Sequence, residues 1–283
     1  MRAVFQWSLG TRTLELGKRT LIMGIVNVTP DSFSDGGLYL DSEKAIDHAL
    51  RLLDEGADII DIGGESTRPG ALSVPLKEEI RRVIPVIDAL AREIKVPISV
   101  DTSKLEVARC ALDAGASIVN NIRGTQISTG FLKMVRDYKA AIVIMHMRGT
   151  PATMQAHTHY ENVINEVIEE IQISVEKCLA IGIKKDRIIV DPGIGFAKTV
   201  DQNLMLIDHL NRLNVTRCPI LLGTSRKSFI GEILQNDAAQ RLMGTAATVT
   251  AGVMRGAHIV RVHDVKAIKE TLRMTDAILN AHA

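Results

Sequence analysis

Residues 56–64 have the sequence GADIIDIGG, in which a helix-ending signal and a buried-strand signal follow one another directly. Gly56 suits the left-handed backbone conformation that closes many helices. The run that follows, residues 58–62, is largely β-branched and apolar on both faces, which is typical of strands in parallel sheets covered by helices. The stretch therefore predicts the end of a helix, a short connection and a buried parallel strand.

The same pattern occurs twice more, as GASIVNNI in residues 115–122 and as GAHIVRVHD in residues 256–264. Around these stretches, strand-like and helix-like segments alternate along the chain. The predicted strands are residues 21–27, 58–63, 97–101, 117–122, 140–146, 187–191, 219–224 and 257–263. The predicted helices are residues 42–55, 77–94, 104–114, 130–138, 161–181, 201–212, 238–254 and 265–281. Pro85 is expected to end or kink the second helix.

Eight strand–helix units without a break in composition predict an α/β fold, a (β/α)8 TIM barrel that forms one domain over residues 1–283. Residues 1–20 contain two short strand-like stretches around Gly10–Thr11, so we expect a β-hairpin ahead of the barrel. An open doubly wound sheet is the alternative fold. That fold should place a glycine-rich nucleotide fingerprint after its first strand, and none follows Val26.

The composition narrows the class of protein. Hydrophobic residues make up 46% of the chain but aromatic residues only 3%, so we expect an aliphatic core. A net charge of +1 gives no electrostatic signature for nucleic acid or a membrane surface. The three cysteines are far apart, no apolar run is long enough to span a membrane, and the first residues lack a signal-peptide core. These features predict a soluble cytoplasmic protein.

Polar residues follow the apolar part of every predicted strand. They are Asn27, residues 65–68, Asp101, Asn120 and Asn121, His146, Asp191, residues 225–227, and Arg261 with His263. In a (β/α)8 barrel the carboxyl ends of the strands form the active-site face. Because buried polar groups cost free energy unless they have partners, such a set predicts a binding or catalytic site.

One part of this set suits an anion. Asn27, Arg261 and His263 lie on the first and last strands, which are neighbours in a closed barrel. An amide, a guanidinium and an imidazole that converge there would bind a phosphate or diphosphate, with the guanidinium giving paired donors. The alternatives are that Arg261 forms a salt bridge to Asp264 or another acid, and that His263 is a core histidine.

A second part suits a heterocycle. Asp101, Asn120 and Asp191 offer acceptors to amino and ring N–H groups, and Lys227 would donate to a ring carbonyl. Paired acids also occur in glycosidases and metal sites, and Asp191 before Pro192 is a common turn-starting arrangement. The loops 27–37 and 63–70 leave strands at the same end and are expected to act as lids.

Eight motifs together resemble the dihydropteroate synthase family. They are GIVNVTPDSFSDGG (24–37), DIGGESTRPGA (61–71), SVDT (99–102), VNNI (119–122), MHMRGTPATMQ (145–155), DPGIGF (191–196), GTSRKSFIG (223–231) and RVHDV (261–265). The resemblance implies a transferase of folate biosynthesis on a (β/α)8 barrel. It would join 6-hydroxymethyl-7,8-dihydropterin diphosphate to p-aminobenzoate and release diphosphate. One departure is Ala197, which stands where the family often has glycine.

The resemblance also implies residue roles. For the pterin these are Asp101, Asn120, Met145, Asp191 and Lys227; for the diphosphate Asn27, Arg261 and His263; and for p-aminobenzoate Thr67, Arg68, Phe196, Ser225 and Lys227. The residues implied in catalysis are Asn27, Asp35, Arg68, Asp101, Lys227, Arg261 and His263. Asn27 would also touch a Mg²⁺ ion, and a homodimer through the C-terminal helices is expected. A pterin-binding methyltransferase module and a non-catalytic paralogue are the alternative functions.

Overall fold

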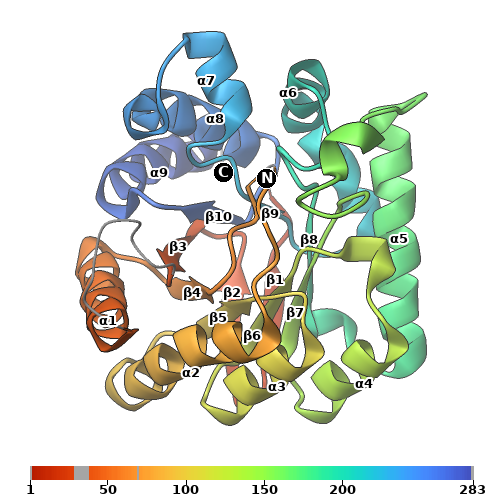
Figure 1. The fold of residues 1–283 in the computed structure, drawn as a ribbon. Helices are drawn as coiled ribbons and strands as arrows, with labels where there is room; N and C mark the ends of the chain where they lie inside the picture. The colour runs from red at the N-terminus through yellow and green to blue at the C-terminus, as the bar shows by residue number, and fades with distance from the viewer. Residues whose placement is uncertain (1, 29–37, 69, 282–283) are drawn as a thin grey trace.

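The computed structural model describes residues 2–28, 38–68 and 70–281 of the 283-residue chain, and in residues 38–41 and at residue 125 it describes only the backbone. Eight parallel strands are hydrogen-bonded in the order β8-β7-β6-β5-β4-β3-β10-β9. A bridge between Val190 and Ile220 joins β8 to the segment before β9. The sheet therefore closes on itself, helices surround it (Figure 1), and the predicted (β/α)8 barrel is confirmed.

The strands lie close to their predicted positions. They are β3 (Leu21–Asn27), β4 (Ile59–Gly63), β5 (Ile98–Asp101), β6 (Ile118–Asn121), β7 (Ala141–Met145), β8 (Ile188–Asp191), β9 (Leu221–Leu222) and β10 (Ile259–Val262). The largest difference is β9, which is much shorter than the predicted residues 219–224. The N–H of Ile220 donates to Nδ1 of His258 at 3.1 Å and not to a strand carbonyl, so regular pairing with β10 begins only at Leu221.

The helices also match the prediction, with two corrections. They are α1 (Leu38–Glu55), α2 (Leu76–Glu93), α3 (Leu105–Asp113), α4 (Thr129–Asp137), α5 (Val163–Ile181), α6 (Val200–Asp208), α7 (Ser228–Leu234), α8 (Leu242–Met254) and α9 (Val265–Asn280). Helix α7 was not predicted. Helix α2 continues through Pro85 instead of ending there, because Pro85 is on the exposed face and the carbonyl that loses its donor can be hydrated. The glycines of the three repeated stretches, Gly56, Gly115 and Gly256, have φ values of 104, 112 and 106°, as expected after a helix.

A predicted hairpin closes the amino end of the barrel. Strands β1 (Phe5–Leu9) and β2 (Arg12–Leu16) are antiparallel. Trp7, which is 0% exposed, packs with Leu16 against inward-facing barrel residues such as Ile59 and Ile189. The lower part of the barrel is therefore filled with apolar side chains, and any site must lie toward the carboxyl ends.

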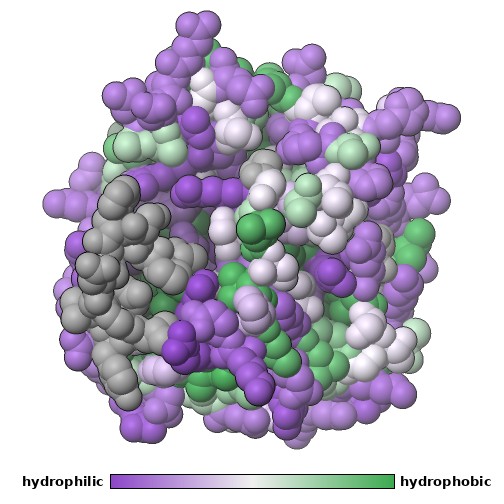
Figure 2. Space-filling view, viewed as in Figure 1, coloured by the Kyte–Doolittle hydropathy of each residue, from purple (hydrophilic) through white to green (hydrophobic). Residues whose placement is uncertain are grey.

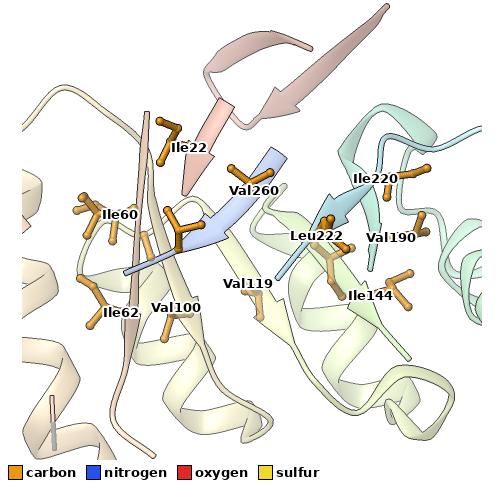
Figure 3. Packing of buried hydrophobic residues seen from close by; sticks show 14 of the residues in the cluster. Ile22, Ile60, Ile62, Val100, Val119, Ile144, Val190, Ile220, Leu222 and Val260 are labelled. Atoms are coloured by element: carbon orange, nitrogen blue, oxygen red, sulfur yellow. The ribbon is translucent and has the colours of Figure 1, made fainter. Parts of the chain in front are cut away.

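Side chains alternate along each strand between the barrel interior and the helices. Ile60, Val100 and Val119 belong to the larger core between the sheet and the helices (Figure 3). The residues between them point inward. Two positions beyond the inward apolar residues Ile59, Ile118, Ile189 and Ile259 stand Asp61, Asn120, Asp191 and Arg261. Because every second residue of a strand points inward, a layer of polar side chains lies directly above the layer of apolar ones.

The outer surface is mainly polar. In the view of Figure 2, hydrophilic residues cover most of the rim of the molecule, and apolar residues gather toward its middle. Within the residues that the structure describes, no helix is long and apolar enough to cross a membrane.

Candidate active site

The floor of the site is a hydrogen-bonded group from four strands. Oδ2 of Asp61 accepts from Nε of Arg261 at 2.6 Å and from Nδ2 of Asn120 at 3.1 Å. A terminal nitrogen of Arg261 donates to Oδ2 of Asp101 at 2.8 Å. All three polar side chains around Arg261 are buried. Because strands β4, β5, β6 and β10 carry these residues at one height, barrel closure is what brings them together.

Burial sets the charges of this group. It raises the pKa of Asp101 to about 7, although Arg261 opposes the shift. Burial also acts to lower the pKa of Arg261, but Asp61 and Asp101 outweigh it, and the net direction is upward. One guanidinium thus lies between two carboxyl groups in a low-dielectric interior.

Several buried oxygens on this floor have no hydrogen-bond partner among the described residues. They are Oδ1 of Asp61, Oδ1 of Asp101 and Oγ of Ser99. Asp61 and Ser99 are opposite one another in the β4–β5 register. Buried polar atoms are rarely left unpaired, so these acceptors are suited to a ligand with several N–H donors.

Asp61 was not among the residues predicted for the site. Its signal in the sequence is a carboxylate at an inward position of an otherwise apolar strand, in IIDIG of β4. The predicted alternative for Arg261, a salt bridge, is present, but its partners are Asp61 and Asp101 and not Asp264. Asp264 is instead paired with Arg226. Arg261 therefore connects the predicted anion and heterocycle residues.

Lys227, Asp191 and Phe196 form the wall of the site beside β8. Nζ of Lys227 donates to the carbonyl of Ile194 and lies 4.0 Å from the centre of the Phe196 ring. Burial lowers the pKa of Lys227 to about 7, against the effect of Asp191. Oδ1 of Asp191 accepts from the Gly193 N–H at 2.7 Å, so the turn-starting role considered for Asp191 is also present. Burial raises the pKa of Asp191.

His263 and Ser225 form a pair after the neighbouring strands β10 and β9. The backbone N–H of His263 donates to Oγ of Ser225 at 3.2 Å, and the hydroxyl lies 3.0 Å from Nδ1 of the imidazole. Burial, followed by Arg261, Arg226 and Arg68, lowers the pKa of His263 to about 3, with Asp264 opposing. The imidazole is therefore neutral at pH 7. With the hydroxyl donating to Nδ1, the hydrogen is on Nε2, which can donate to a ligand.

The remaining predicted residues are spread around the mouth. Asn27 ends β3 with its side chain exposed, and Asp35 lies outside the described residues. Met145 and Phe196 are buried in one apolar cluster. Thr67 and Asp101 line a cavity of about 150 Å³ that also touches Ile122, Arg123 and Met147. Arg68 is exposed on the same loop as Thr67, with its charge close enough to influence His263.

The backbone conformation at Ala197 explains why the family often has glycine at this position. Its φ is 50°, in the left-handed region that favours glycine. Gly193 and Gly195 also have positive φ, at 68 and 82°. A Cβ atom at Gly193 would lie 1.9 Å from the carbonyl oxygen of His146. The loop after β8 thus has a tightly specified backbone, which fixes where Asp191 and Phe196 point.

Comparisons with known proteins agree with this site. The family model described as pterin binding enzyme matches residues 23–263. Dihydropteroate synthase of Synechocystis sp. is 48% identical over 271 residues, covering 95% of this chain and 94% of the relative. Two structures of the Xanthomonas albilineans dihydropteroate synthase are similar. One, with 4-aminobenzoic acid, has a TM-score of 0.91 at 43% identity and covers 98% of this chain and 99% of its own. The other, in complex with 7,8-dihydropteroate, has a TM-score of 0.86 at 40% identity, with coverages of 97% and 99%.

Proposed function

This chain belongs to the family of pterin-binding enzymes, and we propose that it is a dihydropteroate synthase. It condenses 6-hydroxymethyl-7,8-dihydropterin diphosphate with p-aminobenzoate and gives 7,8-dihydropteroate and diphosphate. The observation that carries the proposal is the buried floor of Asp61, Asp101, Asn120 and Arg261, which presents unpaired acceptors in a barrel of this family. Of the similar structures named above, one is with 4-aminobenzoic acid and the other is in complex with 7,8-dihydropteroate.

The floor suits a pterin edge. A pterin has an amino group and ring N–H groups on one edge, and Asp101, Asn120 and Asp191 supply acceptors from three strands. Because Nδ2 of Asn120 donates to Asp61, its Oδ1 is directed away from the carboxylate and remains free to accept. Lys227 supplies the donor for the ring carbonyl, and Met145 with Phe196 supplies apolar contact.

The reaction exchanges one bond for another at the exocyclic methylene. The C–O bond to diphosphate breaks and its electron pair leaves with diphosphate. The arylamine nitrogen then forms the C–N bond and loses a proton to solvent. An arylamine is already a neutral nucleophile, so no strong general base is needed. The protein orients the ring and stabilises the leaving group through Arg261 and the Nε2–H of neutral His263.

The diphosphate leaving group is also the expected binding partner of Mg²⁺. Within the described residues, no group of three or more His, Cys, Asp or Glu side chains could hold a metal ion. Mg²⁺ usually keeps several waters and binds through one or two protein oxygens together with substrate phosphates. The exposed Asn27 side chain at the end of β3 fits an ion that arrives with the diphosphate. Such an ion would neutralise part of the diphosphate charge.

We also propose a homodimer that is active in the cytoplasm. Large apolar side chains are exposed on α7, α8 and α9, namely Ile233, Leu234, Met243, Met254, Met274 and Ile278. Gly252 of α8 is buried against Leu222, so it does not contribute to such a surface. A Met243→Glu variant should dissociate the dimer in sedimentation velocity, and a wild-type monomer would contradict the proposal.

A turnover assay with both substrates, with and without Mg²⁺, tests the function directly. We expect diphosphate and 7,8-dihydropteroate in equal amounts, with faster turnover when Mg²⁺ is present. A methyltransferase module would release no diphosphate. A non-catalytic paralogue would give neither product, and calorimetry would then show whether the pterin diphosphate binds at all. Either outcome would refute the proposed activity.

A further inference from the structure

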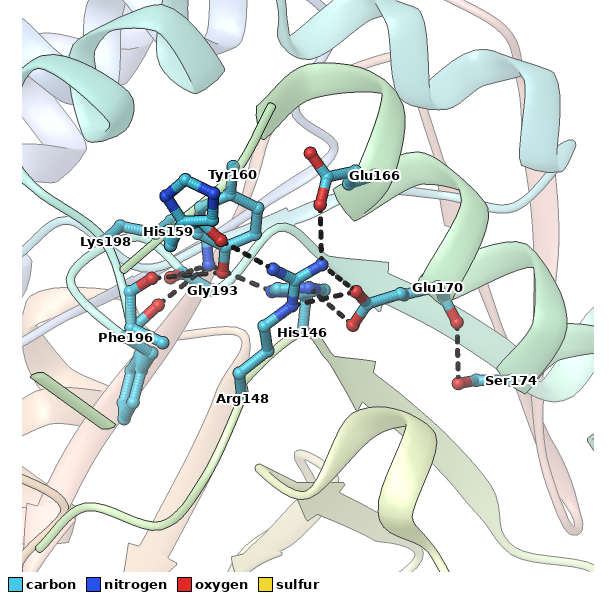
Figure 4. Close-up of polar contacts among 11 residues, drawn as sticks. His146, Arg148, His159, Tyr160, Glu166, Glu170, Ser174, Gly193, Phe196 and Lys198 are labelled. Carbon is cyan, nitrogen blue, oxygen red and sulfur yellow. Dashed lines mark hydrogen bonds and ion pairs between the residues drawn. The ribbon is translucent and has the colours of Figure 1, made fainter. Parts of the chain in front are cut away.

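Beside the site, a ring of polar contacts begins and ends on the loop that follows β8. Figure 4 shows its members, which come from the segments after β7, from α5 and from the loop itself. His146, Arg148, Tyr160, Glu170 and Lys198 form the ring, and none of them has a role in the proposed reaction. Because both ends of the ring are attached to one loop, the ring is suited to hold that loop in place.

Lys198 is the central member. It is 4% exposed, and its Nζ donates to the carbonyls of Phe196 at 2.8 Å and Gly193 at 3.1 Å. The same Nζ lies 3.0 Å from Nδ1 of His146. Burial lowers the pKa of Lys198 to about 7, although Asp191 opposes the shift. In the ammonium form, each of the three hydrogens has one of these three acceptors. One buried side chain thus binds two carbonyls on opposite sides of Ile194.

His146 continues the ring to α5. Its Nδ1 accepts from Lys198, so its hydrogen is on Nε2, which lies 3.0 Å from Oε2 of Glu170. Burial, followed by the charge of Lys198, lowers the pKa of His146 to about 4, and the imidazole is neutral. The histidine therefore connects Lys198 to Glu170 without adding a charge.

Arg148 and Tyr160 return the ring to the loop. Nε of Arg148 donates to Oε1 of Glu170 at 2.9 Å, and a terminal nitrogen donates to Glu166 at 2.9 Å. The Arg148 guanidinium lies 4.1 Å from the centre of the Tyr160 ring. The Tyr160 hydroxyl donates to the carbonyl of Ala197 at 3.0 Å. The carbonyls of Gly193, Phe196 and Ala197 are thus all held from one side.

The held loop carries groups that the proposed function uses. Phe196 lies against Nζ of Lys227, and the carbonyl of Ile194 accepts from that same nitrogen. The Gly193 N–H fixes the carboxylate of Asp191. A displacement of the loop would therefore move one pterin acceptor, one pterin donor and one wall of the p-aminobenzoate pocket together.

We propose that Lys198 is a positioning residue for the dihydropteroate synthase reaction: through its contacts to Gly193, Phe196 and His146 it holds the loop that places Asp191, Phe196 and Lys227. The inference rests on the proposed function. Lys198 itself touches neither substrate, so its role is expressed through the backbone of the loop. A merely structural lysine would affect stability and leave the kinetic constants unchanged.

The test replaces Lys198 by methionine, which has a similar length and no donor. A displacement of about 1 Å at reacting groups costs on the order of 10²-fold in rate, so we expect kcat/KM for p-aminobenzoate to fall about 100-fold in Lys198→Met. The matched control is Lys185→Met. Lys185 donates to the carbonyl of Thr216 at 2.6 Å at the opposite end of β8, and its removal should leave kcat/KM within about 2-fold while lowering the Tm.

A milder variant keeps the test decisive if Lys198→Met does not fold. Tyr160→Phe removes only the hydroxyl that binds Ala197, and one hydrogen bond corresponds to about a 2- to 10-fold fall in kcat/KM. The proposal is overturned if folded variants at Lys198 and Tyr160 keep wild-type kcat/KM for both substrates. If the wild-type protein itself makes no product, the proposed function fails instead, so the two failures are distinguishable.

Discussion

An Asp61→Asn variant should show how much Asp61 contributes to pterin binding and how much it contributes to the stability of the barrel. The Asp61 carboxylate is 0% exposed, and its Oδ2 accepts from Arg261 at 2.6 Å and from Asn120 at 3.1 Å. Asparagine has nearly the same shape, but one of its two terminal atoms is an NH2 group that cannot accept. With its remaining oxygen in the place of Oδ2, the asparagine still accepts from Arg261 and Asn120, so the variant removes the charge facing Arg261 and the unpaired acceptor Oδ1, with almost no change in volume.

The expected cost follows from these contacts. Removing one partner of a buried ion pair costs about 3–5 kcal/mol, and because Asp101 still pairs with Arg261 we expect a loss of about 2–3 kcal/mol in the free energy of unfolding. Weaker positioning of Arg261 by an uncharged partner, together with loss of the unpaired acceptor, should lower kcat/KM for the pterin diphosphate by roughly 10²-fold. Asp61 also helps to raise the pKa of Asp101, after burial as the main cause, so the acid limb of the pH–rate profile should move to lower pH.

The assay compares kcat/KM for each substrate between pH 5 and 9, with urea unfolding of the same samples. Asp58→Asn is the matched control, because Asp58 also pairs with an arginine, Arg19, but at the amino end of the same strand. The control should change stability without changing the pH profile. If Asp61→Asn kept the wild-type KM for the pterin and the wild-type profile, the assignment of Asp61 as the charge that positions Arg261 and as a pterin acceptor would be wrong.

Three further predictions concern separate parts of the chain. Arg68→Ala should raise the KM for p-aminobenzoate about 10-fold through loss of a charged hydrogen bond, and an equal rise for the pterin would indicate a general lid. Gly193→Ala should cost more than about 4 kcal/mol in urea unfolding, since its Cβ would lie 1.9 Å from a carbonyl oxygen. Gly130→Ala, where the nearest atom is at 3.7 Å, should be neutral or stabilising, and similar results for both would refute the steric argument. Burial lowers the pKa of His258 from 6.5 to about 4, so its folded form binds fewer protons and stability should fall by about 2–3 kcal/mol as the pH drops from 6.5 to 4. His258→Asn keeps an acceptor for the Ile220 N–H and should lose much of this acid sensitivity, whereas an unchanged pH dependence would exclude His258 as its source.

The barrel could be predicted because its signals are local. The repeated Gly-Ala-strand stretches, the apolar strand runs and the periodic helices are each readable within about ten residues, and the strand ends were correctly placed at one face. The differences arose where context outweighs local preference. Helix α2 continues through an exposed Pro85, and β9 begins late because the N–H of Ile220 donates to the His258 side chain.

The polar residues of the candidate site, and the contacts between them, could be predicted only in part. Asp101 and Asp191 end their strands, Asn120 lies one residue before the end of its strand, and all three were identified by position, whereas Asp61 lies within an apolar run and was not. Its contact with Arg261 joins residues that are 200 positions apart in the sequence, and no local sequence pattern predicts such a pair. The same holds for Lys198, whose sequence neighbours give no indication that it binds His146, 52 positions away.

The amino-acid sequence alone thus determined the order of strands and helices, and which polar residues follow the strands at one end of the barrel. Pairing within the site followed only from the closed barrel. Side chains on non-neighbouring strands meet at a common height because the sheet closes with a given register, and that register depends on the packing of the whole core. The charges of Asp101, Lys227 and His263 depend on burial in the same way, since burial exists only after folding.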